Sequence, residues 1–234
     1  MIMTTIADQL QQVRARIVQA CAAAGRDAAG VQLLAVSKTF GPDAVREAHA
    51  AGQRAFGENY VQEALDKIAA LADLREQLQW HCIGPLQSNK TRAVAEHFDW
   101  VHSIDRLKIA ERLSAQRPAH LPPLQVCLQV NVDGGANKSG VAAADALALA
   151  QAVVALPRLR LRGLMAIPEP VDGFDAQRAL FLQAREVYEQ LREAGIALDT
   201  LSLGMSADLE AAVAAGSTMV RVGTAIFGGR PRPA

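Results

Sequence analysis

The sequence predicts a single (β/α)8 barrel with a leading amino-terminal helix, and three observations support this fold class. Eight short apolar segments, each bounded by turn-forming residues, have the character of strands buried on both faces. Alanine-rich or amphipathic stretches separate these segments, and strands that alternate with helices form parallel βαβ units. The chain has 234 residues, close to the ~250 residues typical of this barrel. A doubly wound sheet is the alternative, although it usually contains fewer strands.

The elements follow one another in a regular order. The leading helix is expected over residues 4–24, where apolar side chains recur with the spacing of one helix face. The eight strands are expected at residues 31–37, 53–57, 79–84, 100–104, 124–132, 159–167, 198–204 and 218–223. Pro42 suits the first turn of a helix at 43–50, and other crossover helices are expected at residues 61–77, 142–155, 176–194 and 207–215. No linker or low-complexity segment interrupts the series, so one barrel domain is expected over residues 1–234.

The composition fits a globular protein and excludes several classes of partner. Hydrophobic residues make up 50% of the chain, charged residues 21% and aromatic residues 4%, a balance that excludes disorder and requires a core of Ala, Leu and Val. The 24 basic and 24 acidic side chains give a formal net charge of zero. Nucleic acids and anionic membranes attract basic surfaces, so neither is an expected partner.

The cysteines and the amino terminus indicate a cytoplasmic protein. Cys21, Cys82 and Cys127 are odd in number and far apart, in a chain too large to need disulfide bonds. The first residues show no basic segment followed by an apolar one, and no window approaches the ~20 apolar residues of a membrane span.

Lys38 is the first candidate functional residue. The active sites of these barrels lie at the carboxyl ends of the strands, and Lys38 directly follows the first predicted strand. An amine held over an apolar barrel interior loses solvation, its pKa falls, and the neutral form can attack an aldehyde. The alternative is an exposed lysine that only ends the strand.

Two glycine-containing turns follow the seventh and eighth predicted strands. Residues 204–208 place Ser206 at the expected N-cap of the next helix, and residues 221–224 bring Gly223 beside the hydroxyl of Thr224. The loops after these strands form the recurrent phosphate site of such barrels, because free N–H groups and hydroxyls bind anions. Either motif alone is explained as well by a helix cap at Ser206 or by a chain turn at Gly223.

A reactive amine across the barrel mouth from a phosphate socket describes a site for a phosphorylated aldehyde, and pyridoxal 5'-phosphate (PLP) is the first candidate. Arg221 makes this hypothesis more specific, because a guanidinium can only donate hydrogen bonds and leaves a pyridine nitrogen uncharged. We therefore expect the cofactor to be a poor stabiliser of carbanions here. This step fails if Arg221 faces solvent or a core carboxylate.

From Val31 to Gly229 the chain resembles the pyridoxal phosphate homeostasis protein family, a single-barrel group similar to the N-terminal domain of alanine racemase. The resemblance is carried by six segments in order, at residues 35–38, 56–63, 80–90, 163–168, 203–208 and 216–228. Two positions depart from the family pattern: Cys82 stands where Phe is common, and Phe40 where a second lysine is frequent.

The resemblance implies a role for six residues of this sequence. By similarity, Lys38 carries PLP as an internal aldimine and Asn59 lines its ring, while Arg221 meets the ring nitrogen. Ser206, Gly223 and Thr224 are implied to hold the phosphate. Members of the family bind and buffer PLP and are implied to deliver it to apo forms of PLP-dependent enzymes, without an established reaction of their own.

Other polar residues have weaker signals. His81, His97, His102 and Cys82 suggest a metal site, but His81 and Cys82 are adjacent in a strand and point to opposite faces, so no metal is expected. His81 either contacts the ligand pocket or is a satisfied histidine of the barrel wall. Lys90 and Lys138 lie in turn-like segments where a solvated charge is the default, and a transient second aldimine or an anion contact is the alternative. Dinucleotide and nucleoside triphosphate motifs are absent from the sequence.

Two functions from different classes remain as hypotheses. The first is a non-catalytic binding protein that stores and delivers PLP; the second is an amino-acid racemase or a similar enzyme. Racemisation needs bases on both faces of the substrate Cα, and by family resemblance alanine racemase obtains one of them from a second domain and its dimer partner. The 234 residues are accounted for by the barrel, so the expectation is a binding protein without catalytic residues. A barrel with a covered bottom and no obvious apolar seam also favours a monomer.

Overall fold

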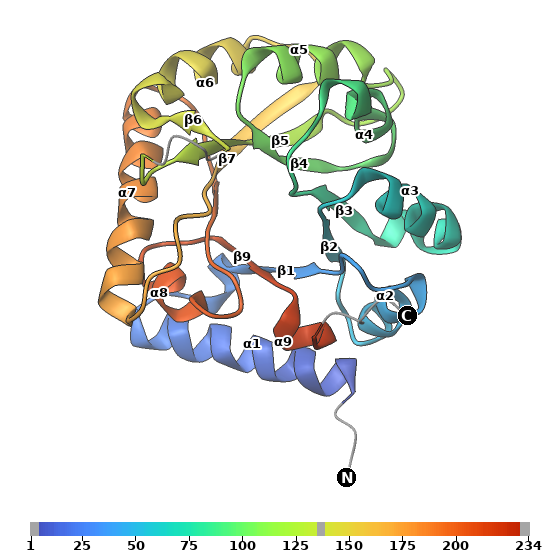
Figure 1. Cartoon of the computed structure of the whole chain (residues 1–234), viewed down its shortest axis with the longest axis vertical. Helices are drawn as coiled ribbons and strands as arrows, with labels where there is room; N and C mark the ends of the chain where they lie inside the picture. Colours follow the sequence, from blue (N-terminus) through green and yellow to red (C-terminus); the bar gives the residue numbers. More distant parts are fainter. Residues whose placement is uncertain (1–4, 135–138, 230–234) are drawn as a thin grey trace.

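The structure is a closed barrel of eight parallel strands with helices outside it (Figure 1). It is a computed structural model, and it describes residues 5–134 and 139–229. The barrel strands are β1 (Gln32–Val36), β2 (Ala55–Glu58), β3 (Gln79–Cys82), β4 (Trp100–Ile104), β5 (Leu124–Asn131), β7 (Leu159–Met165), β8 (Thr200–Ser202) and β9 (Met219–Val222). Each strand pairs in parallel with its neighbours, and the ring is complete because β9 pairs with β1 and β4 pairs with β5.

The predicted fold class and all eight predicted strands are confirmed, with boundaries that differ by two residues at most. The short apolar runs are good markers because strands of a parallel barrel are buried on both faces. One short strand was not predicted: β6 (Val141–Ala142) pairs with the carboxyl end of β5, outside the ring.

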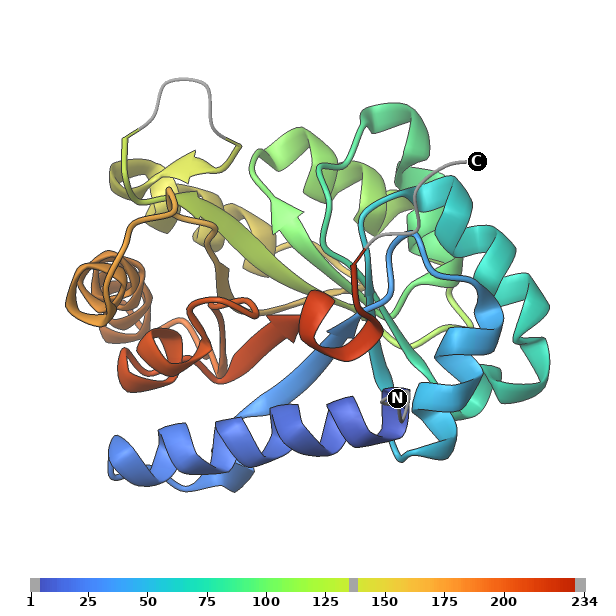
Figure 2. The same cartoon turned by 60° about the horizontal axis from the view of Figure 1, so that its bottom comes forward.

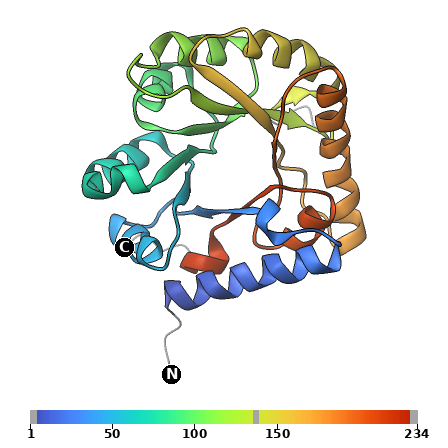
Figure 3. The same cartoon turned by 180° about the vertical axis from the view of Figure 1, so that it is seen from behind.

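The helices lie outside the ring of strands, as the view from behind also shows (Figure 3). They are α1 (Ile6–Ala23), α2 (Pro42–Ala50), α3 (Val61–Ala70), α4 (Thr91–His97), α5 (Leu107–Gln116), α6 (Ala146–Val154), α7 (Phe174–Glu193), α8 (Leu209–Ala214) and α9 (Thr224–Phe227). The helix predicted over 61–77 is interrupted: α3 ends at Ala70 and residues Ala72–Gln77 form a 3-10 helix. None of the helices in residues 5–134 and 139–229 combines the length and apolarity needed to cross a membrane.

Helix α1 confirms the predicted leading helix and packs along the outside of the barrel. Its start is fixed by a capping box, in which Thr5 and Asp8 exchange side-chain to backbone hydrogen bonds. Its apolar face, including Leu10 and Val13, is buried, and the helix contacts α2, α8 and α9 (Figure 2). Helix α1 therefore covers the side of the barrel where β1 and β9 meet.

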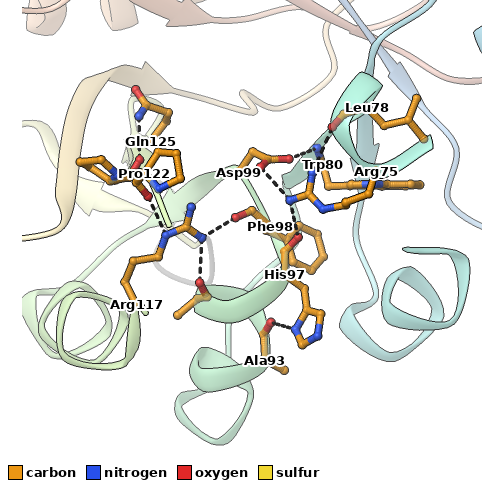
Figure 4. A network of polar contacts seen from close by, with 12 residues as sticks. Arg75, Leu78, Trp80, Ala93, His97, Phe98, Asp99, Arg117, Pro122 and Gln125 are labelled. Atoms are coloured by element: carbon orange, nitrogen blue, oxygen red, sulfur yellow. Dashed lines mark hydrogen bonds and ion pairs between the residues drawn. The ribbon is translucent and has the colours of Figure 1, made fainter. Parts of the chain in front are cut away.

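Two arginines stabilise the loops at the amino-terminal ends of β3, β4 and β5 (Figure 4). Arg117 is 4% exposed and donates hydrogen bonds to the carbonyl oxygens of Ala95, Phe98 and Pro122 at 2.7–2.8 Å. Arg75 donates to a carboxylate oxygen of Asp99 at 2.8 Å. These contacts satisfy carbonyl groups that precede the strands, so this end of the barrel is built for stability.

The barrel interior contains polar as well as apolar side chains. Alternate residues of each strand face the interior, where Leu34, Val36 and Met219 belong to one of the smaller buried clusters. The larger core lies between the strands and the helices. The buried polar side chains of the strands include His81, His102, Ser202 and Arg221.

Candidate functional site

The six residues predicted for the site line one cavity at the carboxyl ends of the strands. The cavity has a volume of about 280 Å³, and Lys38, Asn59, Ser206, Arg221, Gly223 and Thr224 are all among its lining residues. Val36, Phe40, Ile83 and Ile167 supply apolar walls. Ligand pockets are typically ~300–1,000 Å³, so this cavity suits a small, single-ring ligand.

Lys38 lies just beyond the end of β1 and is half-buried. The residues on both sides of it are fixed by hydrogen bonds. Before it, the Ser37 hydroxyl donates to Glu58 Oε1 at 2.6 Å; after it, the Thr39 N–H donates to Glu63 Oε1 at 2.6 Å. Thr39 has a φ of 69°, a conformation that is unusual for a β-branched residue. The turn that carries Lys38 is therefore held against a conformational preference.

The buried ammonium of Lys67 joins these anchors. Lys67, on α3, is 4% exposed, and its Nζ lies 2.7 Å from the Ser37 carbonyl oxygen, 2.8 Å from Glu58 Oε1 and 2.6 Å from Glu63 Oε1. We call Glu58, Glu63 and Lys67 the lysine-turn clamp. Burial raises the pKa of Glu58, and the neighbouring Lys67 opposes that shift. The clamp fixes the backbone on both sides of Lys38.

The loop after β8 carries Ser206, and here one prediction is wrong. Helix α8 begins at Leu209 and its N-cap residue is Asp208, so Ser206 does not cap it. A turn intervenes, in which the Met205 N–H donates to Asp208 Oδ1 at 2.5 Å. Gly204 permits this turn, because its φ is +88° and an added Cβ would lie 2.4 Å from the Cβ of Ala212. Ser206 is half-buried in the cavity wall, and its hydroxyl is not needed by the helix.

The loop after β9 brings Gly223 and Thr224 to the cavity. Gly223 packs against β1, where an added Cβ would lie 3.1 Å from the Val36 carbonyl oxygen. Because β9 pairs with β1, this loop lies next to Lys38. The predicted placement of the loop, across the barrel mouth from Lys38, is therefore wrong. Phe40 stacks on Phe227 with ring centroids 5.2 Å apart and forms an apolar edge of the cavity.

Arg221 projects from β9 toward the cavity and is 4% exposed. Its Nη1 donates to the Ser202 carbonyl oxygen at 2.6 Å and to Ser202 Oγ at 2.9 Å, and its Nη2 donates to the Ala166 carbonyl oxygen at 3.0 Å. The acceptors are two carbonyl oxygens and one hydroxyl oxygen, so none of these hydrogen bonds is made to solvent or to a carboxylate. Burial lowers the pKa of Arg221 to about 10, which leaves the guanidinium protonated at neutral pH.

The other candidate residues are not part of this cavity wall. His81 points to a different partner, His102, at 2.9 Å. Cys82 is buried, and burial raises its thiol pKa to about 12. Lys90 is half-buried in the 3-10 helix Ser88–Lys90, and Lys138 lies outside the described residues. Within residues 5–134 and 139–229, no group of three or more His, Cys, Asp or Glu side chains is arranged to hold a metal ion.

Sequence reasoning missed the lysine-turn clamp and the partners of Arg221. Glu58 and Glu63 belong to one of the segments that carry the family resemblance, yet no pattern in the sequence marked them or Lys67 as neighbours of Lys38. A signal was present in Glu58, a carboxylate that directly follows the apolar strand predicted at residues 53–57, because a charge buried there requires a partner.

The fold and the site define a single-barrel protein of the alanine racemase N-terminal kind. The family model "Alanine racemase, N-terminal domain" matches residues 9–231. The chain belongs to the family of pyridoxal phosphate homeostasis proteins within this group. It is 65% identical over 228 residues to the pyridoxal phosphate homeostasis protein of Pseudomonas aeruginosa, covering 97% of each chain.

Solved structures give the same result. The structure of PipY from Synechococcus elongatus without PLP matches with a TM-score of 0.84 and 43% identity, covering 96% of this chain and 100% of PipY. The structure of PipY with PLP bound matches with a TM-score of 0.82 and 42% identity, with the same coverage. The predicted family resemblance is thus confirmed.

Proposed function

We propose that this protein binds PLP covalently through Lys38 and serves PLP homeostasis by storing the cofactor and delivering it to apo enzymes. The observation that carries the proposal is the convergence of all six predicted residues on one cavity. The relatives support it, because the P. aeruginosa relative is named a pyridoxal phosphate homeostasis protein and PipY has been solved with PLP bound.

The residues present fit the cofactor at each of its functional groups. Lys38 would supply the amine for a Schiff base with the cofactor aldehyde, whose oxygen would be released as water. Ser206 and Thr224 offer hydroxyls and Gly223 exposes backbone in the two loops that form the phosphate site of such barrels. Asn59 and Ile83 lie beside the space for the ring.

Arg221 favours carriage of the cofactor over catalysis. PLP promotes amino-acid chemistry by withdrawing electrons into a protonated pyridine ring. A guanidinium has no lone pair to accept the ring proton, so Arg221 donates to the nitrogen and keeps it unprotonated. We therefore propose storage and delivery as the function; an amino-acid racemase is the alternative that the experiment must test.

Two linked measurements test the proposal. After incubation with PLP, borohydride reduction and peptide mapping should locate a pyridoxyl group on Lys38. The adduct should be lost in Lys38→Ala and retained in Lys90→Ala, a matched change of a half-buried lysine outside the cavity. Loaded protein should then activate an apo-transaminase. An unmodified Lys38 overturns covalent binding, failure to activate overturns delivery, and turnover of an amino acid by the protein alone favours the racemase.

A further inference from the structure

A chain of four buried polar side chains extends from the cavity into the barrel interior. Arg221 Nη1 lies 2.9 Å from Ser202 Oγ, His102 Nδ1 lies 3.1 Å from the same oxygen, and His102 Nε2 lies 2.9 Å from His81 Nδ1. Arg221 is 4% exposed and the other three residues are 0% exposed. The four residues come from β9, β8, β4 and β3, so the fold and not local sequence brings them together.

The hydrogen bonds of this chain run in one direction. Arg221 can only donate, so Ser202 Oγ accepts a hydrogen bond from Arg221 and uses its own hydroxyl hydrogen to donate a hydrogen bond to His102 Nδ1. His102 must then carry its proton on Nε2 and donate it to His81 Nδ1. His81 in turn carries its proton on Nε2, a buried atom that has no hydrogen-bond partner among the described residues. The opposite orientation would leave the Ser202 hydroxyl proton without an acceptor in this chain.

Both imidazole rings are held in the neutral form. Burial lowers the pKa of His81 to about 3, and burial together with the nearby His81 and Arg221 lowers the pKa of His102 well below its ordinary value. His81 is further fixed by stacking on Trp100, with ring centroids 5.2 Å apart and an interplanar angle of 7°. The hydrogen-bonded series of His81, His102 and Ser202 is therefore uncharged, and it ends at the Arg221 cation.

We propose that Ser202, His102 and His81 are positioning residues that hold the Arg221 guanidinium in the orientation required by the cofactor ring. The inference rests on the proposed function, because it assigns Arg221 a ligand. Three of the five guanidinium N–H groups are used by Ser202 and Ala166. The Nε–H and one Nη2–H are not used in these bonds, and Arg221 lines the cavity. Without the chain, the Ser202 hydroxyl can rotate away and the long Arg221 side chain gains other rotamers.

Nitrogen NMR of the unloaded protein tests the chain independently of cofactor binding. Long-range spectra of 15N-histidine-labelled protein should show His81 and His102 as neutral Nε2–H tautomers from pH 6 to 8. Arginine-labelled protein should show restricted rotation of the Arg221 Nη groups, and this restriction should be lost in His102→Phe, which keeps a ring but removes both hydrogen bonds. An Nδ1–H tautomer at His102, or Arg221 signals unchanged in the variant, overturns the inference.

A double-mutant cycle on PLP binding separates positioning from general stability. His102→Phe should raise the Kd for PLP by about tenfold and shift the absorption maximum of the bound cofactor. In an Arg221→Met background the same change should have no further effect, because the residue that it positions is absent. Equal loss of affinity in both backgrounds means that His102 acts through stability alone, and contradicts the proposal.

A second pair of variants serves if His102→Phe does not fold. Ser202→Ala removes the bridging hydroxyl and should reproduce the loss of affinity. Ser217→Ala is the matched control, because Ser217 is equally buried but bonds the carbonyl oxygens of Leu201, Leu203 and Met219 instead of the Arg221 guanidinium. Similar effects of the two variants overturn the inference. A wild-type protein that forms no Lys38 adduct refutes the proposed function. The NMR result still tests whether His102 and Ser202 hold the Arg221 side chain.

Discussion

At the scale of single residues, we predict that Glu63 of the lysine-turn clamp affects PLP binding through the turn that carries Lys38. Glu63 Oε1 accepts a hydrogen bond from the Thr39 N–H and forms an ion pair with Lys67 Nζ, both at 2.6 Å. Glu63→Ala removes this acceptor and releases the turn. Thr39 in that turn has a φ of 69°, which a β-branched residue does not favour. We expect PLP affinity to fall about tenfold, the effect of a lost hydrogen bond worth about 1.4 kcal/mol. Absorbance titration with PLP measures the change.

Glu63→Gln is the control for this prediction. The glutamine keeps an acceptor oxygen in place, so it should bind PLP within about twofold of the wild-type protein while removing the charge. If the alanine and glutamine variants weaken binding equally, the negative charge matters and the hydrogen bond to Thr39 does not.

The same residues show what could be predicted from the sequence at this scale. Lys38 was predicted because it directly follows an apolar strand at the mouth of the barrel. Arg221 was predicted because it precedes the Gly223–Thr224 turn and can donate to a pyridine nitrogen. Lys67 was not, because a lysine on an amphipathic helix is ordinarily solvated, and its contacts with Glu58 and Ser37 span 9 and 30 residues. His102, which is linked to Arg221 through Ser202, lies 100 residues from Ser202 in the sequence.

At the scale of elements, β7 and β8 approach so closely that only glycine fits at position 163. Gly163 pairs with Thr200, and an added Cβ would lie 1.6 Å from the Thr200 carbonyl oxygen. Backbone cannot rotate away as a side chain does, so Gly163→Ala must separate the two strands. We expect a loss of about 3 kcal/mol or more in the free energy of unfolding, and a Tm lower by about 6–12 °C.

Gly30→Ala is the matched control, because a Cβ at Gly30 meets no atom within 4 Å. Calorimetry or thermal circular dichroism of the two variants compares them directly, and a Gly163→Ala protein as stable as Gly30→Ala would falsify the close-approach argument.

Element boundaries also show where sequence patterns stop being informative. The strands were predicted well because each is a short apolar run between turn residues. The helix expected at 61–77 is broken at Leu71, where φ is −113° although the surrounding side chains favour helix. Ser206 has the residue type of an N-cap, but the turn closed by Asp208 delays the helix by two residues. Both differences depend on the path by which the chain leads to the next strand or helix. The helix preference of single residues does not specify that path.

At the scale of the whole molecule, the buried histidine pair makes the fold sensitive to mild acid. The folded pKa values of His81 and His102 are depressed by burial, to about 3 for His81, whereas an unfolded histidine has a pKa of about 6.5. Below about pH 6.5 the unfolded chain therefore binds protons that the folded chain does not. The stability due to the neutral rings is fully present above that pH and is lost as the pH falls toward 3.

The size of this effect follows from linkage. Each ring lowers the free energy of unfolding by about 1.4 kcal/mol between pH 7.5 and 5.5, so the pair contributes about 3 kcal/mol over that range. Ionisation of Glu58 acts in the opposite direction, because burial raises its pKa. That group is the same in wild-type and His81→Phe proteins, so it cancels when the two are compared.

Guanidinium unfolding at pH 7.5, 6.5 and 5.5 tests the prediction. His81→Phe preserves a ring to stack on Trp100 but removes one of the two titrating groups. Its absolute stability falls because His102 Nε2 loses its acceptor. Its loss of stability between pH 7.5 and 5.5 should nevertheless be smaller than that of the wild-type protein by about 1.4 kcal/mol. If the two proteins lose stability equally with acid, His81 is not the neutral, buried ring on which the orientation of the Arg221 chain depends.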